Sequence, residues 1–174
     1  LHDALPISPP GIMKAIITST FSASSESNNN FRLCLEYVPG ETIEQWNPDN
    51  AARCGHLSLV QKFRNQDKHC TELGADSAAG NGHLEIVRDL YAHGIRCTSR
   101  GAHRGAQYGH VAVVQQLRDY GIHCRPGAAD AAAELGHVDM VQDLRAHGIH
   151  CTTDGADRAA WYGHLAMIED LRAH

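Results

Sequence analysis

Apolar residues in the C-terminal three quarters of the chain recur with the spacing of one face of a helix. Leu84, Ile86, Val87 and Leu90 stand at offsets of zero, two, three and six, with charged residues between them. This spacing is typical of a helix, because a half-buried strand alternates strictly. Each stripe predicts an amphipathic helix of about ten residues. The same offsets return at Val111, Val113, Val114 and Leu117; at Val138, Met140, Val141 and Leu144; and at Leu165, Met167, Ile168 and Leu171.

Small residues precede every stripe at spacings of three and four. Ala75, Ala78 and Ala79 fall on one helix face, so they predict a first helix of about two turns that approaches its neighbours closely. A glycine follows each helix, as at Gly82 and Gly94, where the left-handed conformation ends a helix at no steric cost. The copies of the small face are Ala102, Gly105 and Ala106; Ala129, Ala132 and Ala133; and Ala156, Ala159 and Ala160. The residues predicted as N-caps are Thr98, Thr152 and Thr153.

These features share one period of 27 residues, carried by Gly-His dipeptides, by cysteines and by an apolar position of the second helix. The units run 47–73, 74–100, 101–127 and 128–154, followed by a shorter one at 155–174. One helix–turn–helix–loop unit is too small to bury its own stripe, so neighbouring units must stack. The period therefore predicts an all-α fold, an α-solenoid of stacked helix pairs.

Two segments resemble the second half of an ankyrin repeat, GNGHLEIVRDLYAHGI at 80–95 and AAWYGHLAMIEDLRAH at 159–174. The resemblance covers residues 47–174. An ankyrin repeat has about 33 residues and a β-turn, whereas this unit has 27 and lacks the Thr-Pro-Leu-His start. The chain is thus similar to a short, all-helical variant of the superfamily. The resemblance implies protein binding, and with so short a loop it directs attention to the first helices.

Three segments precede the repeats. We interpret residues 1–12 as a non-native leader, because LHDALPIS at 1–8 reads as a translated sequencing adapter, and we take Met13 as the natural start. The Ser/Asn-rich segment 13–30 is expected to be unstructured. Residues 31–46 are expected to form a degenerate repeat or an N-terminal cap, sealed by Trp46. Because the last unit stops at His174, within a motif, we expect the natural protein to continue.

The composition of the chain limits the classes of partner that it is expected to bind. Hydrophobic residues make up 43% and charged residues 20%, which suits a packed core. The formal net charge of -5 disfavours a nucleic-acid binder, and no apolar run reaches the roughly 18 residues of a membrane span. The expected partner is therefore a protein, with no nucleic acid and no membrane, and the chain itself is expected to be a monomer. Without a convincing signal peptide, it is expected in the cytoplasm.

Three His-Cys dipeptides raise the possibility of zinc, at His69-Cys70, His123-Cys124 and His150-Cys151. No close pairing of ligands completes a tetrahedral site, so we expect neither a metal nor another cofactor. Stacked helices lie about 8–10 Å apart, which is too far for a disulfide between neighbouring units, since its Cα atoms lie within about 7 Å. Free, mostly buried thiols are expected.

The histidine of each Gly-His dipeptide is repeated in every unit, which indicates a structural role such as a bond to a neighbouring loop. His93, His147 and His174 lie near the ends of second helices, where the helix dipole favours a cation. A nucleophile with its base, a phosphate loop and a dinucleotide fingerprint are all missing. The chain is therefore expected not to be an enzyme.

The positions that vary between units are the candidates for recognition. Aromatic and arginine side chains are common binding anchors, and Trp161 is the strongest candidate among them. Tyr108, Leu135 and Tyr162 have an alternative role, packing against the next unit. The expected function is a protein–protein interaction scaffold; the alternatives are a targeting arm of a larger enzyme or ubiquitin-ligase-type adaptor, and a metal-responsive protein. The predicted partner-binding residues are Asp76, Asn81, Arg104, Gln107, Tyr108, Glu134, Leu135, Asp157, Arg158, Trp161 and Tyr162.

Overall fold

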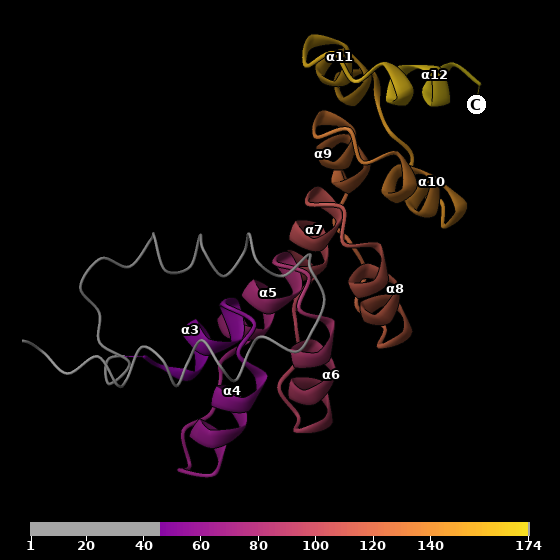
Figure 1. The fold of residues 1–174 in the computed structure, drawn as a ribbon. Coiled ribbons are helices and arrows are strands. Elements are labelled where there is room, and N and C mark those ends of the chain that lie inside the picture. The colour runs from indigo at the N-terminus through magenta and orange to yellow at the C-terminus, as the bar shows by residue number, and fades with distance from the viewer. Residues whose placement is uncertain (1–45, 174) are drawn as a thin grey trace, which may run out of the picture. The chain divides into compact units, whose positions relative to one another are not determined.

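The computed structural model describes residues 46–173, and within this range the chain is all α-helical, with ten helices and no strand (Figure 1). The predicted leader, the Ser/Asn-rich segment, the predicted cap except Trp46, and His174 lie outside the described residues. In chain order the helices are α3 (Pro48–Arg53), α4 (Leu57–Arg64), α5 (Glu72–Gly80), α6 (Leu84–Ala92), α7 (Ser99–Gln107), α8 (Val111–Asp119), α9 (Ala128–Glu134), α10 (Val138–Ala146), α11 (Thr153–Trp161) and α12 (Leu165–Ala173).

The helices come in pairs, and the predicted glycines end both members of a pair. Gly82, between α5 and α6, has φ +78°, and Gly94, after α6, has φ +82°. A threonine begins the next pair: the Thr98 hydroxyl accepts a hydrogen bond from the Arg100 N–H at 3.1 Å. Thr71 caps α5 in the same way, although the sequence analysis did not predict it.

Of the three predicted N-caps, Thr98 and Thr152 are confirmed in position and Thr153 is wrong. Thr152 occupies the N-cap position of α11, but its hydroxyl makes no capping bond and donates to Asp130 instead. Thr153 is the first residue of α11 and so lies inside the helix. The α9 helix has Gly127 at its N-cap, with φ +85°, because the unit 101–127 ends in Arg-Pro-Gly where its neighbours carry a threonine.

Each pair packs on the pair that follows it. The first helices contact one another in series, from α3 through α5, α7 and α9 to α11, and the second helices do so from α6 through α8 and α10 to α12. Small residues permit this close approach, as predicted: Ala79, Ala106 and Ala133 are fully buried, and a Cβ at Gly105 would lie 3.3 Å from the Ala79 carbonyl oxygen. The apolar stripes of α6, α8 and α10 fill the space between the two series.

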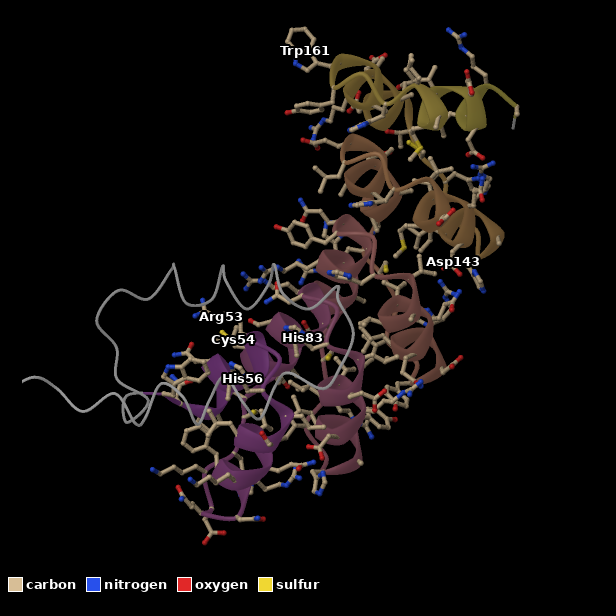
Figure 2. All side chains as sticks on the ribbon, viewed as in Figure 1. Arg53, Cys54, His56, His83, Asp143 and Trp161 are labelled. Carbon is tan, nitrogen blue, oxygen red and sulfur yellow. The ribbon has the colours of Figure 1, made fainter. Side chains whose placement is uncertain are left out.

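The Gly-His dipeptides join neighbouring pairs. Each histidine ring covers the glycine of the preceding pair, so a Cβ at Gly82 would lie 2.6 Å from His110 Nδ1. The glycine is therefore required twice, for its positive φ and for the room it leaves. His83 Nε2 lies 3.0 Å from the Arg53 carbonyl oxygen (Figure 2), and His164 Nε2 lies 3.0 Å from that of Glu134. These bonds confirm the predicted structural role.

The periodic cysteines also follow the repeat. The Cys97 thiol donates to the Ala75 carbonyl oxygen at 3.3 Å, and Cys70 bonds Pro48 in the same way. Burial raises the pKa of the Cys97 thiol to about 12. Free, buried thiols are confirmed for Cys70 and Cys97, whereas Cys124 and Cys151 are free but only half-buried.

Candidate functional site

The predicted apolar contact residues lie at the C-terminal ends of consecutive first helices. Tyr108, Leu135 and Tyr162 are the C-cap residues of α7, α9 and α11, and Trp161 is the last residue of α11. Because α7 contacts α9 and α9 contacts α11, the stacking places these side chains in one row. We call Tyr108, Leu135, Trp161 and Tyr162 the C-cap strip.

The C-cap strip remains exposed where a following helix pair covers its surroundings. Tyr108 is 44% exposed and Leu135 41% exposed, although α9 and α11 pack directly beyond them. Single apolar side chains on a protein surface need no explanation, whereas neighbouring exposed apolar side chains are typical of contact surfaces. Packing against the next unit therefore accounts for only part of each side chain.

Trp161 and Tyr162 are more exposed, at 86% and 59%. Trp161 projects away from the α11 ribbon (Figure 2). No helix pair follows α12 within the described residues, and Ala160 is exposed where Ala79, Ala106 and Ala133 are fully buried. Part of the surface exposed at α11 is therefore covered by the next pair at α7 and α9. For this reason the exposed fractions of Tyr108 and Leu135 describe the C-cap strip better than those of Trp161 and Tyr162.

Two predicted partner-binding residues hold the repeats together instead. Asp76 is 4% exposed; its two carboxylate oxygens accept bonds from the Thr98 N–H and hydroxyl, both at 2.7 Å. Asn81 is half-buried and donates to the Arg53 carbonyl oxygen at 2.8 Å. The assignment of Asp76 to a binding surface is wrong, since burial makes its side chain inaccessible, and Asn81 has an internal partner. We remove both from the candidate surface.

The remaining predicted residues are polar neighbours of the C-cap strip. Arg158 and Glu134 form an ion pair at 2.8 Å between α11 and α9. Arg104 crosses Gly80 of α5, since a Cβ there would lie 3.1 Å from the Arg104 Cβ. Gln107 is half-buried, and Asp157 is exposed. The surface therefore combines apolar anchors with guanidinium groups, which suits recognition of another macromolecule.

Sequence reasoning missed the aspartate–threonine bonds between pairs. Asp49 accepts from Thr71, and Asp130 from Thr152, as Asp76 does from Thr98, in each case through the threonine N–H and hydroxyl. Each aspartate lies 22 residues before its threonine, so the repeated Asp and Thr positions were a usable signal. We call each such pair a rung.

One rung is replaced. At the equivalent positions of the unit 101–127 stand His103 and Arg125, and a backbone hydrogen bond links the histidine to Arg125. Burial lowers the pKa of His103, and the charge of Arg125 lowers it further. Among the described residues, His103 Nδ1 is a buried polar atom with no hydrogen-bond partner. This rung therefore lacks the carboxylate that secures the others.

A small cavity of about 160 Å³ lies between α8, α10 and the loop after α8. Its lining includes Cys124, Arg118 and His147. Burial raises the pKa of the Cys124 thiol to about 11, so this cysteine is protonated near neutral pH and is a poor nucleophile. Within residues 46–173, no group of three or more potential ligands is arranged for a metal ion.

None of the described helices combines the length and the apolar character that a membrane-crossing helix needs. A scan against models of known protein families gives no match for this chain, and no curated protein matches it. Function is therefore inferred from the geometry of the described residues.

Proposed function

We propose that this protein is a protein–protein interaction scaffold that binds its partner through the C-cap strip. One observation carries the proposal. Tyr108 and Leu135 stay more than two fifths exposed at the same position of consecutive stacked helices, where a structural role alone would favour polar residues. Tyr and Trp are favoured at binding surfaces because they offer a large contact area at a low cost in conformational entropy.

The architecture proposed with this function is an α-solenoid of short ankyrin-like repeats. Support comes from the 27-residue period of the helices, from the packing of each first helix on the next, and from the histidine that covers the preceding glycine. In such an array the shared positions form the core, and the variable positions are free to recognise a partner. The C-cap strip consists of variable positions.

The polar neighbours of the strip suit a protein partner. Arg104 and Arg158 supply guanidinium groups beside apolar side chains, and Gln107 supplies an amide. Protein interfaces typically combine an apolar centre with a polar rim. The ion pair of Arg158 with Glu134 fixes one such rim group before a partner arrives.

Site-specific photo-crosslinking in cells tests the proposal. A photoreactive phenylalanine analogue at Leu135 is expected to capture a discrete protein, and the same analogue at Tyr108 is expected to capture that protein too. The matched control is Asp139, an exposed residue in the first turn of α10, away from the C-cap strip. Equal capture at Asp139, or no discrete product at either strip position, would contradict the proposal.

A further inference from the structure

The arginines around α7 differ from most others in the described part of the chain. Arg64, Arg118 and Arg145 each pair with an aspartate of the next second helix, and Arg88 and Arg158 pair with glutamates. Among the described residues, no carboxylate forms an ion pair with Arg96, Arg100, Arg104 or Arg125. Arg96 lies over the Tyr91 ring, so Arg100, Arg104 and Arg125 are three cations beside α7 that have no ion pair among the described residues.

These unpaired arginines are close in the fold. Arg100 and Arg104 are four residues apart on α7, so they share one face of that helix. Arg125 donates from Nε to the Ser99 hydroxyl at 3.2 Å, which holds it at the start of α7. We call Arg100, Arg104, Arg125 and the adjacent His103 the basic patch.

The fold explains why Arg104 has no partner. Its counterpart in α11, Arg158, pairs with Glu134 of the preceding first helix. The position equivalent to Glu134 in front of Arg104 is Gly80, which has no side chain, and Arg104 lies across it. The same geometry therefore gives an internal ion pair in one unit and leaves an available guanidinium in the other.

The replaced rung adds positive charge at a structural cost. Where three rungs have an aspartate and a threonine, this one has His103 and Arg125, and a buried histidine nitrogen remains without a partner. Leaving a buried polar group unsatisfied destabilises the folded state. Departures from a local rule without a structural gain are expected at functional sites. The replaced rung therefore lies at the same place as the unpaired arginines, since Arg125 belongs to both.

We propose that the basic patch binds an acidic segment of a partner protein, whose carboxylates pair with Arg100, Arg104 and Arg125. This inference rests on the proposed function, because Tyr108 ends the helix that carries Arg100 and Arg104, and the acidic segment continues onto the C-cap strip. Planar guanidinium groups bind carboxylates with two parallel hydrogen bonds. The patch also opposes the net charge of -5 of the whole chain, so an acidic ligand is drawn to this place in particular.

The surroundings favour a peptide over a nucleic acid. Glu72 of α5 is exposed and stands at the position equivalent to Ser99, so an acidic residue without an ion pair among the described residues lies on a helix that flanks α7. A nucleic acid that extended beyond the basic patch would bring its phosphates close to this negative charge. Its affinity depends on many successive cationic contacts, which the short patch does not supply. An acidic peptide with apolar residues needs only a short basic patch beside an apolar strip.

Fluorescence polarisation with the complete chain tests the inference. The probe is a short labelled peptide of Glu and Leu, and the reference peptide has Gln in place of Glu. We expect the double variant R100Q/R104Q to weaken binding of the acidic peptide about fivefold to tenfold, as the loss of two exposed ion pairs implies. The control R88Q/R172Q removes the same charge from exposed positions of second helices and should change binding by less than about twofold.

A second variant keeps the test independent of misfolding. Each rung aspartate packs against a glycine, as Asp76 does against Gly101, and this unit has Ala128 at that position. The variant H103D/R125T/A128G therefore rebuilds the rung found at three other places, so its thermal midpoint should rise while its affinity for the acidic peptide falls. A rise in thermal midpoint with unchanged affinity would overturn the inference. So would equal binding of the Gln peptide, an equal loss in R88Q/R172Q, or tighter binding of a single-stranded oligonucleotide than of the acidic peptide.

The two proposals fail separately. If crosslinking at Tyr108 and Leu135 captures a partner but the acidic peptide ignores R100Q/R104Q, the inference about the basic patch is wrong and the scaffold proposal stands. If the acidic peptide depends on the basic patch but the strip captures nothing, the C-cap strip is not the partner surface.

Discussion

Consecutive second helices pack on one another at contacts that we call junctions. Two neighbouring junctions, α6–α8 and α8–α10, have different polar side chains at equivalent positions. Between α8 and α10, Arg118 donates to the Asp143 carboxylate at 2.5 Å and to His147 Nε2 at 3.0 Å. Between α6 and α8, the three equivalent positions hold Tyr91, Gln116 and Tyr120. The two tyrosine rings stack there with centroids 3.6 Å apart, and Gln116 accepts a bond from Arg88 at 2.8 Å.

All three polar residues of one junction are replaced in the other, and no charge is left unpaired. This explains why both junctions form. Changing only the arginine to tyrosine would leave an aspartate without its cation, and an unpaired, partly buried charge costs several kcal/mol. Here the aspartate is replaced by a neutral amide and the histidine by a second ring. Below both junctions the apolar layer is shared, since Leu90, Leu117 and Leu144 are all buried. The apolar layer therefore sets the junction, and the polar set above it is exchangeable.

Leu117→Ala should cause the largest loss, because this fully buried side chain packs below both junctions. We expect the free energy of unfolding to fall by about 2–5 kcal/mol, from lost burial and a residual cavity. Urea denaturation measures this change. Leu165→Ala is the matched control, because Leu165 is exposed, and it should stay within about 0.5 kcal/mol. A near-neutral Leu117→Ala would show that the shared layer does not set the junctions.

Asp143→Ala tests the charged junction alone. Asp143, on α10 (Figure 2), accepts bonds from Arg118 and from Gln115, and the side chains of both Asp143 and Arg118 are largely buried. We expect a loss of about 1–3 kcal/mol in the free energy of unfolding. Gln116→Ala, at the neutral junction, should cost about 1 kcal/mol or less. Equal costs at the two sites would remove the proposed difference between the junctions.

Transplanting the neutral set gives a smaller effect. The variant R118Y/D143Q/H147Y copies the α6–α8 junction into the α8–α10 junction. We expect it to lie within about 1.5 kcal/mol of the parent, and so to be less damaging than Asp143→Ala, because no charge is left unpaired. Calorimetry compares the three proteins. A transplant more harmful than the single substitution would mean that the polar set depends on its own surroundings.

Acid should weaken the stacking of the pairs that form both junctions, because the Gly-His histidines join each of these pairs to the one before it. Burial lowers the pKa of His83, His110 and His137 below the ordinary 6.5. The unfolded chain therefore binds more protons, and stability, complete above about pH 6.5, decreases as the pH falls below that value. Urea midpoints at pH 7 and pH 5 measure the loss. The transplant variant keeps these three histidines, so it should also lose stability at pH 5; a flat profile in either protein would contradict the argument.

Trp161→Ala is expected to have the smallest effect on folding. The side chain is 86% exposed and takes no part in either junction, so stability should change by less than about 0.5 kcal/mol. The same substitution should weaken capture of the partner by the C-cap strip. Thermal denaturation of the purified variant gives the first quantity. A large loss of stability would place Trp161 in the packing of α11 and remove it from the strip.

The local features of this protein follow from its sequence. The stripe offsets predict the second helices, the Ala and Gly spacing predicts close-packed first helices, and the glycines predict where each ends. These features depend on residues close together in the chain, whose effects on backbone conformation and periodicity are local. The Gly-His period likewise indicated a structural histidine, which the bond of His83 to Arg53 confirms.

What only the tertiary structure decided are the contacts between units. Asp76 is polar and was predicted to lie on the surface, but packing of α5 on α7 buries it against Thr98. The rungs, the tyrosine stack and the unpaired arginines depend in the same way on side chains 22 to 29 residues apart. Periodicity fixes which face of a helix is apolar. Whether a polar side chain on the other face meets a neighbour or solvent depends on how closely two helices approach, and that distance is set by packing.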